Sequence, residues 1–281
     1  MKVEILEPAA YCAGVSRAIE IAKKARQEHP DKDVYVLGML VHNNYVVKEL
    51  EKDNIKTVNS LGEVPKGSVL IFSAHGHKQE FDKIAEKKKL IVYDSVCPIV
   101  LSNIQTIKEN LAQGHQIIYI GIEGHPEAEA CLSLSSDVIL FSENILENYQ
   151  SLKDQKPLVI NQTTLNIREI SSVHSTILSV LPKARISDEI CATTRLRQDA
   201  IERIDNDVDL IIVVGDVNSS NTRRLLEVAM QAHPEVESIM ISSEKELIPT
   251  IFANKNHIVI SSGASTPREI IDAVYNKIKN Y

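Results

Sequence analysis

Residues 97–127, CPIVLSNIQTIKENLAQGHQIIYIGIEGHPE, contain the pattern that organises the whole chain: a cysteine, a segment of helical period, an apolar run and a polar end. Apolar residues such as Ile104 and Ile107 recur at helical spacing, and QIIYIGI is typical of a buried strand. The same order of features follows Cys12 and Cys191. A pattern that recurs three times at a similar period predicts three repeated structural units.

Each unit contains two apolar runs, and polar residues follow each run. The first runs are VYVLGMLV, QIIYIGIE and LIIVVGDV, and the second runs are SVLIFSA, PLVINQ and HIVISSGA. Short apolar runs that alternate with helical segments are typical of α/β folds with parallel sheets, which bind ligands at the carboxyl ends of their strands. We therefore expect an α/β fold of three pseudo-threefold-related lobes with mostly parallel sheets. The polar residues expected to surround a ligand are His42, His75, His125, Thr164, Ser219, Ser220, Asn221 and Ser265.

The lobe boundaries follow from the repeat, because no Gly-, Ser- or Pro-rich linker separates the units. The expected lobes are residues 1–96, 97–190 and 191–281. The N-terminal run KVEIL precedes the first cysteine, and we expect it to complete the sheet of the last lobe.

Composition excludes several classes of function. The 281 residues are 43% hydrophobic and 25% charged, which is typical of a globular protein. A formal charge of −7, the absence of tryptophan and an aromatic content of 4% argue against a nucleic-acid partner. No apolar run approaches the roughly 20 residues that cross a bilayer, and the N-terminus does not resemble a signal peptide. We expect a soluble, cytoplasmic protein without a membrane partner.

The cysteines point to metal or redox chemistry. Four widely separated cysteines do not form a disulfide framework. Cys12, Cys97 and Cys191 each precede a helical segment, and a helix N-terminus lowers the pKa of a thiol and favours the thiolate. Three thiolates at equivalent positions without a neighbouring histidine favour a central iron–sulfur cluster with one open coordination position. A zinc site or three structural cysteines are the alternatives. Cys131 lies outside the repeat, and we expect it to pack in a helix.

The polar residues favour a phosphate or diphosphate ligand. They are donors without a permanent negative charge, and several precede helices whose N-termini add backbone N–H groups. Ser219 and Ser265 could instead be helix caps. Glu127 is the exception, a carboxylate that follows Gly-His-Pro, and with His125 it predicts a path for a proton. Its alternative role is to stabilise a helix dipole, which Glu129 fits better.

Eight short motifs together resemble one enzyme family over the whole chain. They are Cys12-Ala13-Gly14-Val15, Val41-His42-Asn43, Ser73-Ala74-His75-Gly76, Cys97-Pro98, Gly124-His125-Pro126-Glu127, Gln162-Thr163-Thr164-Leu165, Asn218-Ser219-Ser220-Asn221 and Gly263-Ala264-Ser265. This set is similar to that of the hydroxymethylbutenyl diphosphate reductases, the last enzymes of the methylerythritol phosphate route to isoprenoids.

The resemblance implies an oxidoreductase with one [4Fe–4S] cluster per chain, held by Cys12, Cys97 and Cys191. It would reduce (E)-4-hydroxy-3-methylbut-2-enyl diphosphate to isopentenyl and dimethylallyl diphosphates. Thr164 would hold the substrate hydroxyl, and Glu127 would supply protons. The residues implied around the diphosphate are His42, His75, His125, Ser219, Ser220, Asn221 and Ser265. Because no G-x-G-x-x-G fingerprint is present, we expect electrons from a separate ferredoxin or flavodoxin.

The chain departs from the family pattern at a few positions, namely Tyr11, Val96, Ala130-Cys131 and Thr193. None of these is an expected ligand-binding group. The rival interpretation is a non-redox protein, either a zinc phosphoesterase or a module that binds a phosphorylated metabolite. Colour separates the two interpretations, because an iron–sulfur protein purified without oxygen is brown and the rivals are colourless.

Overall fold

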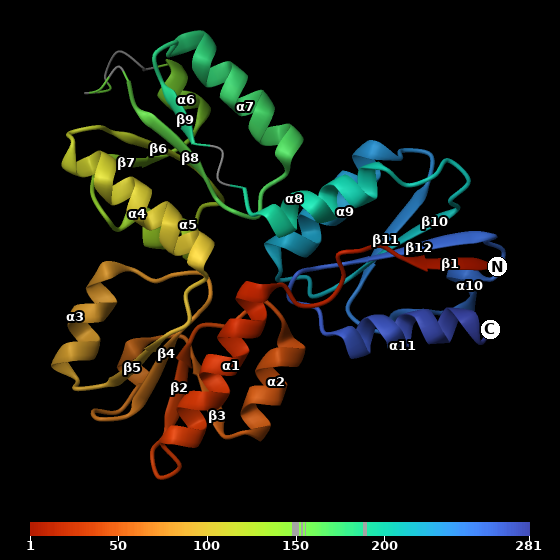
Figure 1. The fold of residues 1–281 in the computed structure, drawn as a ribbon, viewed down its shortest axis with the longest axis horizontal. Helices are drawn as coiled ribbons and strands as arrows, with labels where there is room; N and C mark the ends of the chain where they lie inside the picture. The colour runs from red at the N-terminus through yellow and green to blue at the C-terminus, as the bar shows by residue number, and fades with distance from the viewer. Residues whose placement is uncertain (148–151, 153, 155, 188–189) are drawn as a thin grey trace. The chain divides into compact units, whose positions relative to one another are not determined.

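The computed structural model describes residues 1–147, 152, 154, 156–187 and 190–281. This part of the chain contains three four-stranded sheets, and every pair of neighbouring strands is parallel (Figure 1). The prediction of an α/β fold with three parallel sheets is confirmed. The chain divides into two compact units, and the boundaries of the three expected lobes stay predictions. The first unit comprises Met1–Ser16, His42–Tyr45 and Cys191–Tyr281, and the second comprises Arg17–Val41 and Val46–Ile190.

The first unit contains one sheet, in the order β1-β12-β10-β11. Its strands are β1 (Lys2–Ile5), β10 (Leu210–Val214), β11 (Glu237–Ile241) and β12 (His257–Ser262). Its helices are α8 (Ala192–Glu202), α9 (Ser220–Ala232), η3 (Glu244–Glu246), α10 (Pro249–Phe252) and α11 (Arg268–Lys279).

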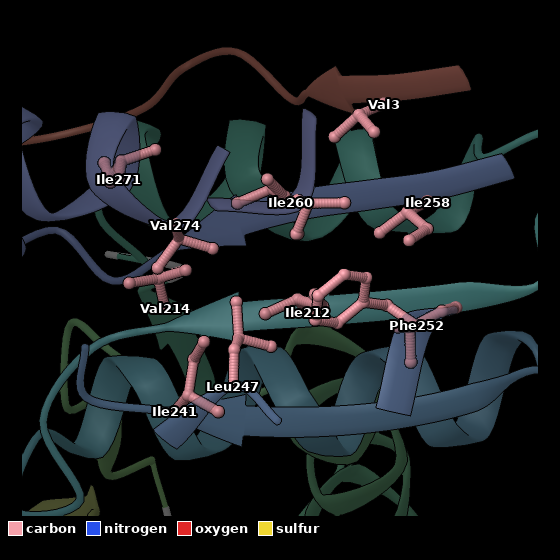
Figure 2. Close-up of a cluster of buried hydrophobic side chains, with 12 residues drawn as sticks. Val3, Ile212, Val214, Ile241, Leu247, Phe252, Ile258, Ile260, Ile271 and Val274 are labelled. Atoms are coloured by element: carbon pink, nitrogen blue, oxygen red, sulfur yellow. The ribbon is translucent and has the colours of Figure 1, made fainter. Parts of the chain in front are cut away.

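Strand β10 is buried on both faces, as a central strand of a covered parallel sheet should be. Ile212 and Val214 belong to a cluster with Ile271 and Val274 of α11, which Figure 2 shows together with side chains of the other three strands. The intervening Val213 belongs to a second cluster that includes residues of α8 and α9. The strand therefore alternates its side chains between two helical layers.

The N-terminal strand completes this sheet. β1 pairs in parallel with β12, from Lys2 opposite His257 to Ile5 opposite Ile260. Val3 packs in the same cluster as Ile212 of β10. The expectation that the N-terminal run joins the sheet of the last repeat is confirmed.

The second unit contains two sheets, in the orders β3-β2-β4-β5 and β7-β6-β8-β9. The first has β2 (Val34–Leu37), β3 (Ile55–Val58), β4 (Val69–Phe72) and β5 (Ile91–Asp94), with η1 (Leu61–Glu63) and α3 (Gln79–Lys87). The second has β6 (Ile117–Ile120), β7 (Val138–Leu140), β8 (Leu158–Asn161) and β9 (Arg185–Ser187), with α4 (Pro98–Ala112), α5 (Pro126–Leu132), α6 (Glu143–Glu147) and α7 (Ile167–Val180). Helices α1 (Ala13–Glu28) and α2 (Asn44–Lys52) each contain residues of both units.

Strand β6 is also buried on both faces. Ile117 and Tyr119 pack in a cluster with Cys131 of α5 and residues of α4. Ile118 and Ile120 pack in another cluster that includes residues of α7. Pro98 and Pro126 stand at the first positions of α4 and α5, where proline needs no hydrogen-bond partner and its fixed φ suits a helix start.

All three sheets have the same strand order, and this order locates their ligand-binding ends. In each sheet one strand lies between the next two strands of the chain: β2 lies between β3 and β4, β6 between β7 and β8, and β10 between β11 and β12. The chain therefore leaves neighbouring strands in opposite directions at β2/β4, β6/β8 and β10/β12. In open parallel sheets such switch points form crevices at the carboxyl ends of the strands, where ligands bind.

Strand β2 ends earlier than the apolar run predicts. The run VYVLGMLV reaches Val41, but the strand stops at Leu37 because Gly38 takes a φ of +69°, a left-handed conformation that breaks extended backbone. Leu40 and Val41 are nevertheless fully buried, so apolar character there marks a buried loop. No helix among the described residues is long and apolar enough to cross a membrane.

Candidate functional site

Three cysteines occupy the same local position, immediately before a helix. The carbonyl oxygens of Cys12, Cys97 and Cys191 accept the first i to i+4 hydrogen bond of α1, α4 and α8, each with an N···O distance of 3.0 Å. Neither Cys97 nor Cys191 uses its thiol to cap its helix. All three are partly exposed and none forms a disulfide, whereas Cys131 is fully buried. The predicted helix-mouth position and the packing role of Cys131 agree with the structure.

A buried cation lies near two of these thiols in the first unit. Arg197 of α8 is 1% exposed, and its guanidinium donates to the carbonyl oxygens of Ala10 at 2.6 Å and Ser262 at 2.7 Å. Burial lowers the pKa of Arg197, while Cys12 and Cys191 oppose this shift. The buried guanidinium thus places a positive charge near these two sulfur atoms, where it could balance the negative charge of a bound metal cluster. The sequence reasoning gave Arg197 no role.

The cysteines as a set remain a predicted ligand site. Among the described residues no three His, Cys, Asp or Glu side chains are grouped so that they could hold a metal ion. Cys12 and Cys191 belong to the first unit and Cys97 to the second. Their donor chemistry, three thiols that form no disulfide and stand at the starts of helices, suits an iron–sulfur cluster.

In the first unit, the segment around His42 is tied to the carboxyl ends of β10 and β12. The Asn43 side chain donates to the Ser265 carbonyl at 2.7 Å, and the Ser265 hydroxyl donates to the His42 carbonyl at 3.2 Å. Asp216, two residues after β10, accepts from the backbone N–H of Asn44 at 2.8 Å and from its side chain at 2.9 Å. The structure thus brings together His42 and Ser265, which are distant in sequence.

Burial lowers the pKa of His42; Asp216 opposes this shift and Arg223 adds to it. The imidazole is therefore neutral at neutral pH. It can offer one N–H donor without the energetic cost of a buried positive charge.

The start of α9 contains a buried side chain whose hydrogen-bonding capacity is unused. Ser219 caps this helix, since its hydroxyl accepts from the Thr222 N–H at 3.2 Å. Asn221 is 6% exposed, and in the described part of the chain neither its amide nitrogen nor its amide oxygen has a hydrogen-bond partner. Buried polar groups are normally paired, so an idle amide at a helix N-terminus, next to the buried Ser220, suits a polar or anionic ligand.

In the second unit, Glu127 in the first turn of α5 is buried and hydrogen-bonded to Thr163, in the loop that follows β8. It is 2% exposed, and its two oxygens accept from the Thr163 backbone N–H at 2.8 Å and the Thr163 hydroxyl at 2.9 Å. His125 caps α5, with its Nδ1 accepting from the Glu127 N–H at 3.2 Å. His75 lies beside it, with ring centroids 5.9 Å apart in an edge-on arrangement.

This environment shifts the protonation of Glu127. Burial raises the pKa of its carboxyl from 4.5 to about 7, while the hydrogen bonds from Thr163 and the nearby Tyr119 hydroxyl group oppose the rise. A carboxyl that is about half protonated at neutral pH can both donate and accept a proton. The alternative role of a dipole-stabilising surface glutamate belongs to Glu129, which pairs with Lys78 at 2.8 Å.

The sequence reasoning chose Thr164 and missed Thr163. Thr163 contacts Glu127 directly, whereas the Thr164 hydroxyl accepts from the Gln162 side chain at 3.2 Å. The side-chain Oε1 of Gln162 in turn accepts from the Ile122 N–H at 3.0 Å. The motif Gln-Thr-Thr drew attention to this loop, but the sequence alone does not show which of the two adjacent threonines contacts Glu127. The proposed contact between Thr164 and the substrate stays a prediction.

Comparison with known proteins yields one consistent family. The family model described as LytB protein matches residues 3–279. The 4-hydroxy-3-methylbut-2-enyl diphosphate reductase of Malacoplasma penetrans (strain HF-2) is 34% identical over 281 residues, which cover 95% of this chain and 93% of that protein. The enzyme of the same name from Macrococcus caseolyticus (strain JCSC5402) is 35% identical over 292 residues, covering all of this chain and 90% of that protein.

A solved structure agrees with these relatives. The E-1-hydroxy-2-methyl-but-2-enyl-4-diphosphate reductase from Plasmodium falciparum is 30% identical and superposes with a TM-score of 0.91, covering 98% of this chain and 87% of that chain.

Proposed function

The chain belongs to the LytB protein family, and from this premise we propose that it is a 4-hydroxy-3-methylbut-2-enyl diphosphate reductase. The reaction removes the allylic hydroxyl as water. The C–O bond breaks, one C–H bond forms, and two electrons and two protons are consumed to give isopentenyl or dimethylallyl diphosphate. The zinc phosphoesterase and the binding module are not favoured, because the relatives are named as reductases.

The observation that carries this function is the buried, hydrogen-bonded position of the Glu127 carboxyl group. The departing hydroxyl needs a proton, and a buried carboxyl with a pKa of about 7 holds one at the pH of the cell in about half of the molecules. The Thr163 hydrogen bonds hold the carboxyl in one orientation. We assign Glu127 as the proton source, with His125 beside it.

Asn221 supports the assignment of the diphosphate. Its buried amide has no partner among the described residues, so a diphosphate oxygen could accept from its nitrogen without displacing an existing hydrogen bond. His42 and Ser265 lie in the same unit, and the Ser265 hydroxyl donates a hydrogen bond to the His42 carbonyl oxygen. We therefore assign both residues to the same ligand. His75, His125, Ser219 and Ser220 complete the proposed set.

Cys12, Cys97 and Cys191 would hold a [4Fe–4S] cluster, one per chain. When bound, this group would supply electrons one at a time and a Lewis-acidic iron for the substrate hydroxyl. The buried Arg197 would balance part of the negative charge of two of the thiolates. A ferredoxin or flavodoxin as electron donor and a cytoplasmic location are further parts of the proposal.

An anaerobic assay with a chemically reduced dye and the allylic diphosphate tests the function. We expect consumption of the diphosphate and formation of both isomeric products by a brown protein. Glu127→Gln should lower kcat at least about a hundredfold while iron content is unchanged. Colourless protein without iron, or an iron-loaded protein that leaves the diphosphate intact, would contradict the proposal.

The binding assignment has its own test. Asn221→Ala should raise KM markedly with an unchanged cluster spectrum. Asn276→Ala removes the same amide from an exposed position of α11 and should leave KM unchanged. Equal KM values in the wild type and both variants would remove Asn221 from the substrate site.

A further inference from the structure

The hydroxyl of Tyr119 is an anomaly in an otherwise apolar layer. Tyr119 of β6 is fully buried in a cluster with aliphatic residues of β6, β8 and α4 and with Ala128 and Cys131 of α5. Its Oη has no hydrogen-bond partner among the described residues. A phenylalanine would bury the same ring without the cost of an unpaired hydroxyl, so burial alone does not explain the tyrosine.

The ring of Tyr119 packs closely against the backbone at Gly121. A Cβ at Gly121 would lie 2.6 Å from Cε1 of the Tyr119 ring, closer than real atoms approach. Gly121 therefore provides the space that the ring occupies. Tyr119 is in strand β6, and Glu127 is in α5, the helix that follows this strand along the chain.

The Glu127 carboxylate can accept more hydrogen bonds than it receives, and the Tyr119 hydroxyl can donate one. Thr163 supplies one hydrogen bond to each carboxylate oxygen, and an ionised carboxylate accepts about four. The Tyr119 hydroxyl lies near enough to lower the pKa of Glu127, although it does not meet the geometry of a formed hydrogen bond. Burial, together with Glu127 and Cys131, raises the pKa of Tyr119 well above its usual range, so the phenol keeps its proton and remains a donor.

Two other titratable residues, Cys131 and His125, belong to α5 or to its start and differ from Tyr119 in donor strength or in position. Burial raises the pKa of the Cys131 thiol, which stays neutral and is a weak donor. His125 uses its Nδ1 to accept the Glu127 N–H. Tyr119 is therefore the strong donor available to the carboxylate from the β6 side.

We propose that Tyr119 is a positioning residue: its hydroxyl donates a hydrogen bond to the Glu127 carboxylate once that group has given up its proton. The protonated carboxyl does not need this donor, whereas the buried carboxylate does. The hydroxyl thus stabilises the ionised form and keeps the carboxylate in place until it is protonated again. The inference rests on the proposed function only where it treats Glu127 as a proton source for turnover.

The test is an infrared pH titration of the anaerobically purified protein, following the carbonyl stretch of the protonated carboxyl. Glu127→Gln identifies the band by its loss. In Tyr119→Phe, which keeps the ring on Gly121, the midpoint should rise by about one pH unit, a tenfold change in the acid dissociation constant. The matched control is Tyr35→Phe, which changes a buried tyrosine of β2 in another core cluster and should leave the band in place. An unchanged or lowered midpoint in Tyr119→Phe would overturn the proposal.

A second substitution tests the same donor in the opposite direction. Incorporation of 3-fluorotyrosine at position 119 makes the phenol more acidic and a stronger donor, so the midpoint should fall; a rise or no change would contradict the proposal.

Measurements of turnover distinguish a failure of this inference from a failure of the proposed function. A protein without reductase activity whose band still shifts would refute the function alone. An active reductase whose kcat–pH profile and band are both unmoved in Tyr119→Phe would refute the role of Tyr119 alone.

Discussion

Replacing Glu127 with glutamine should change how the stability of the protein depends on pH. Burial raises the pKa of this carboxyl from 4.5 to about 7, so between these pH values the folded protein holds a proton that the unfolded chain has released. The resulting stabilisation is fully present below about pH 4.5 and is lost as the pH rises through about 7. At 1.36 kcal/mol per pKa unit it amounts to about 3 kcal/mol, of which about 2.5 kcal/mol is lost between pH 5 and pH 8.

Glutamine preserves the surroundings while removing the titration. Its side-chain oxygen can still accept from the Thr163 N–H, and its nitrogen can donate to the Thr163 hydroxyl oxygen. The free energy of unfolding of Glu127→Gln should therefore lack the part of the pH dependence that Glu127 causes. Because both proteins would carry the same cofactor, its contribution cancels in the difference between them.

Urea unfolding followed by far-ultraviolet circular dichroism, at pH 5, 6, 7 and 8 without oxygen, measures this difference. The stability of the wild type relative to Glu127→Gln should fall by about 2.5 kcal/mol across the series. Glu86→Gln, which removes an exposed carboxylate from α3, is the control for a change of surface charge. A wild-type-minus-variant difference that stays constant or increases with pH would refute the conclusion that Glu127 is protonated by burial.

The remaining predictions concern the cysteines, a close contact and a helix cap. Cys131→Ser should retain iron and activity because this thiol is a buried packing group, whereas iron analysis of Cys97→Ser should show a large loss; the reverse pattern would exclude the proposed ligand set. Gly121→Ala should lower the free energy of unfolding by about 1–3 kcal/mol, since the new methyl group overlaps the ring of Tyr119, and unchanged stability in urea would contradict this packing. Asn166→Ala should cost about 1 kcal/mol by removing the cap of α7, measurable as a lower urea midpoint, while aspartate at this position should preserve most of the stability.

Local patterns in the sequence were sufficient to predict the fold class. Apolar runs, helical spacing and residues such as Pro98 and Pro126 act within a few positions of the chain, so they predicted parallel strands, helix starts directly after the cysteines and polar residues at strand ends. The family followed from motifs spread over the whole chain, and the comparisons confirmed it. The apolar run before His42 predicted a strand that is longer than the one in the structure. Hydrophobicity alone does not show that the strand ends before Gly38 and that the remaining apolar residues form a buried loop.

The tertiary structure decided the chemistry of the individual side chains. Nothing near Glu127 in the sequence indicates that its pKa lies close to 7, because that value depends on burial by distant segments and on hydrogen bonds from Thr163, 36 positions away. The idle amide of Asn221 and the hydroxyl of Tyr119 became visible only when every neighbour was known. Residue type and spacing determine which groups can bind or transfer protons, whereas desolvation and long-range contacts determine which of them are charged, paired or available.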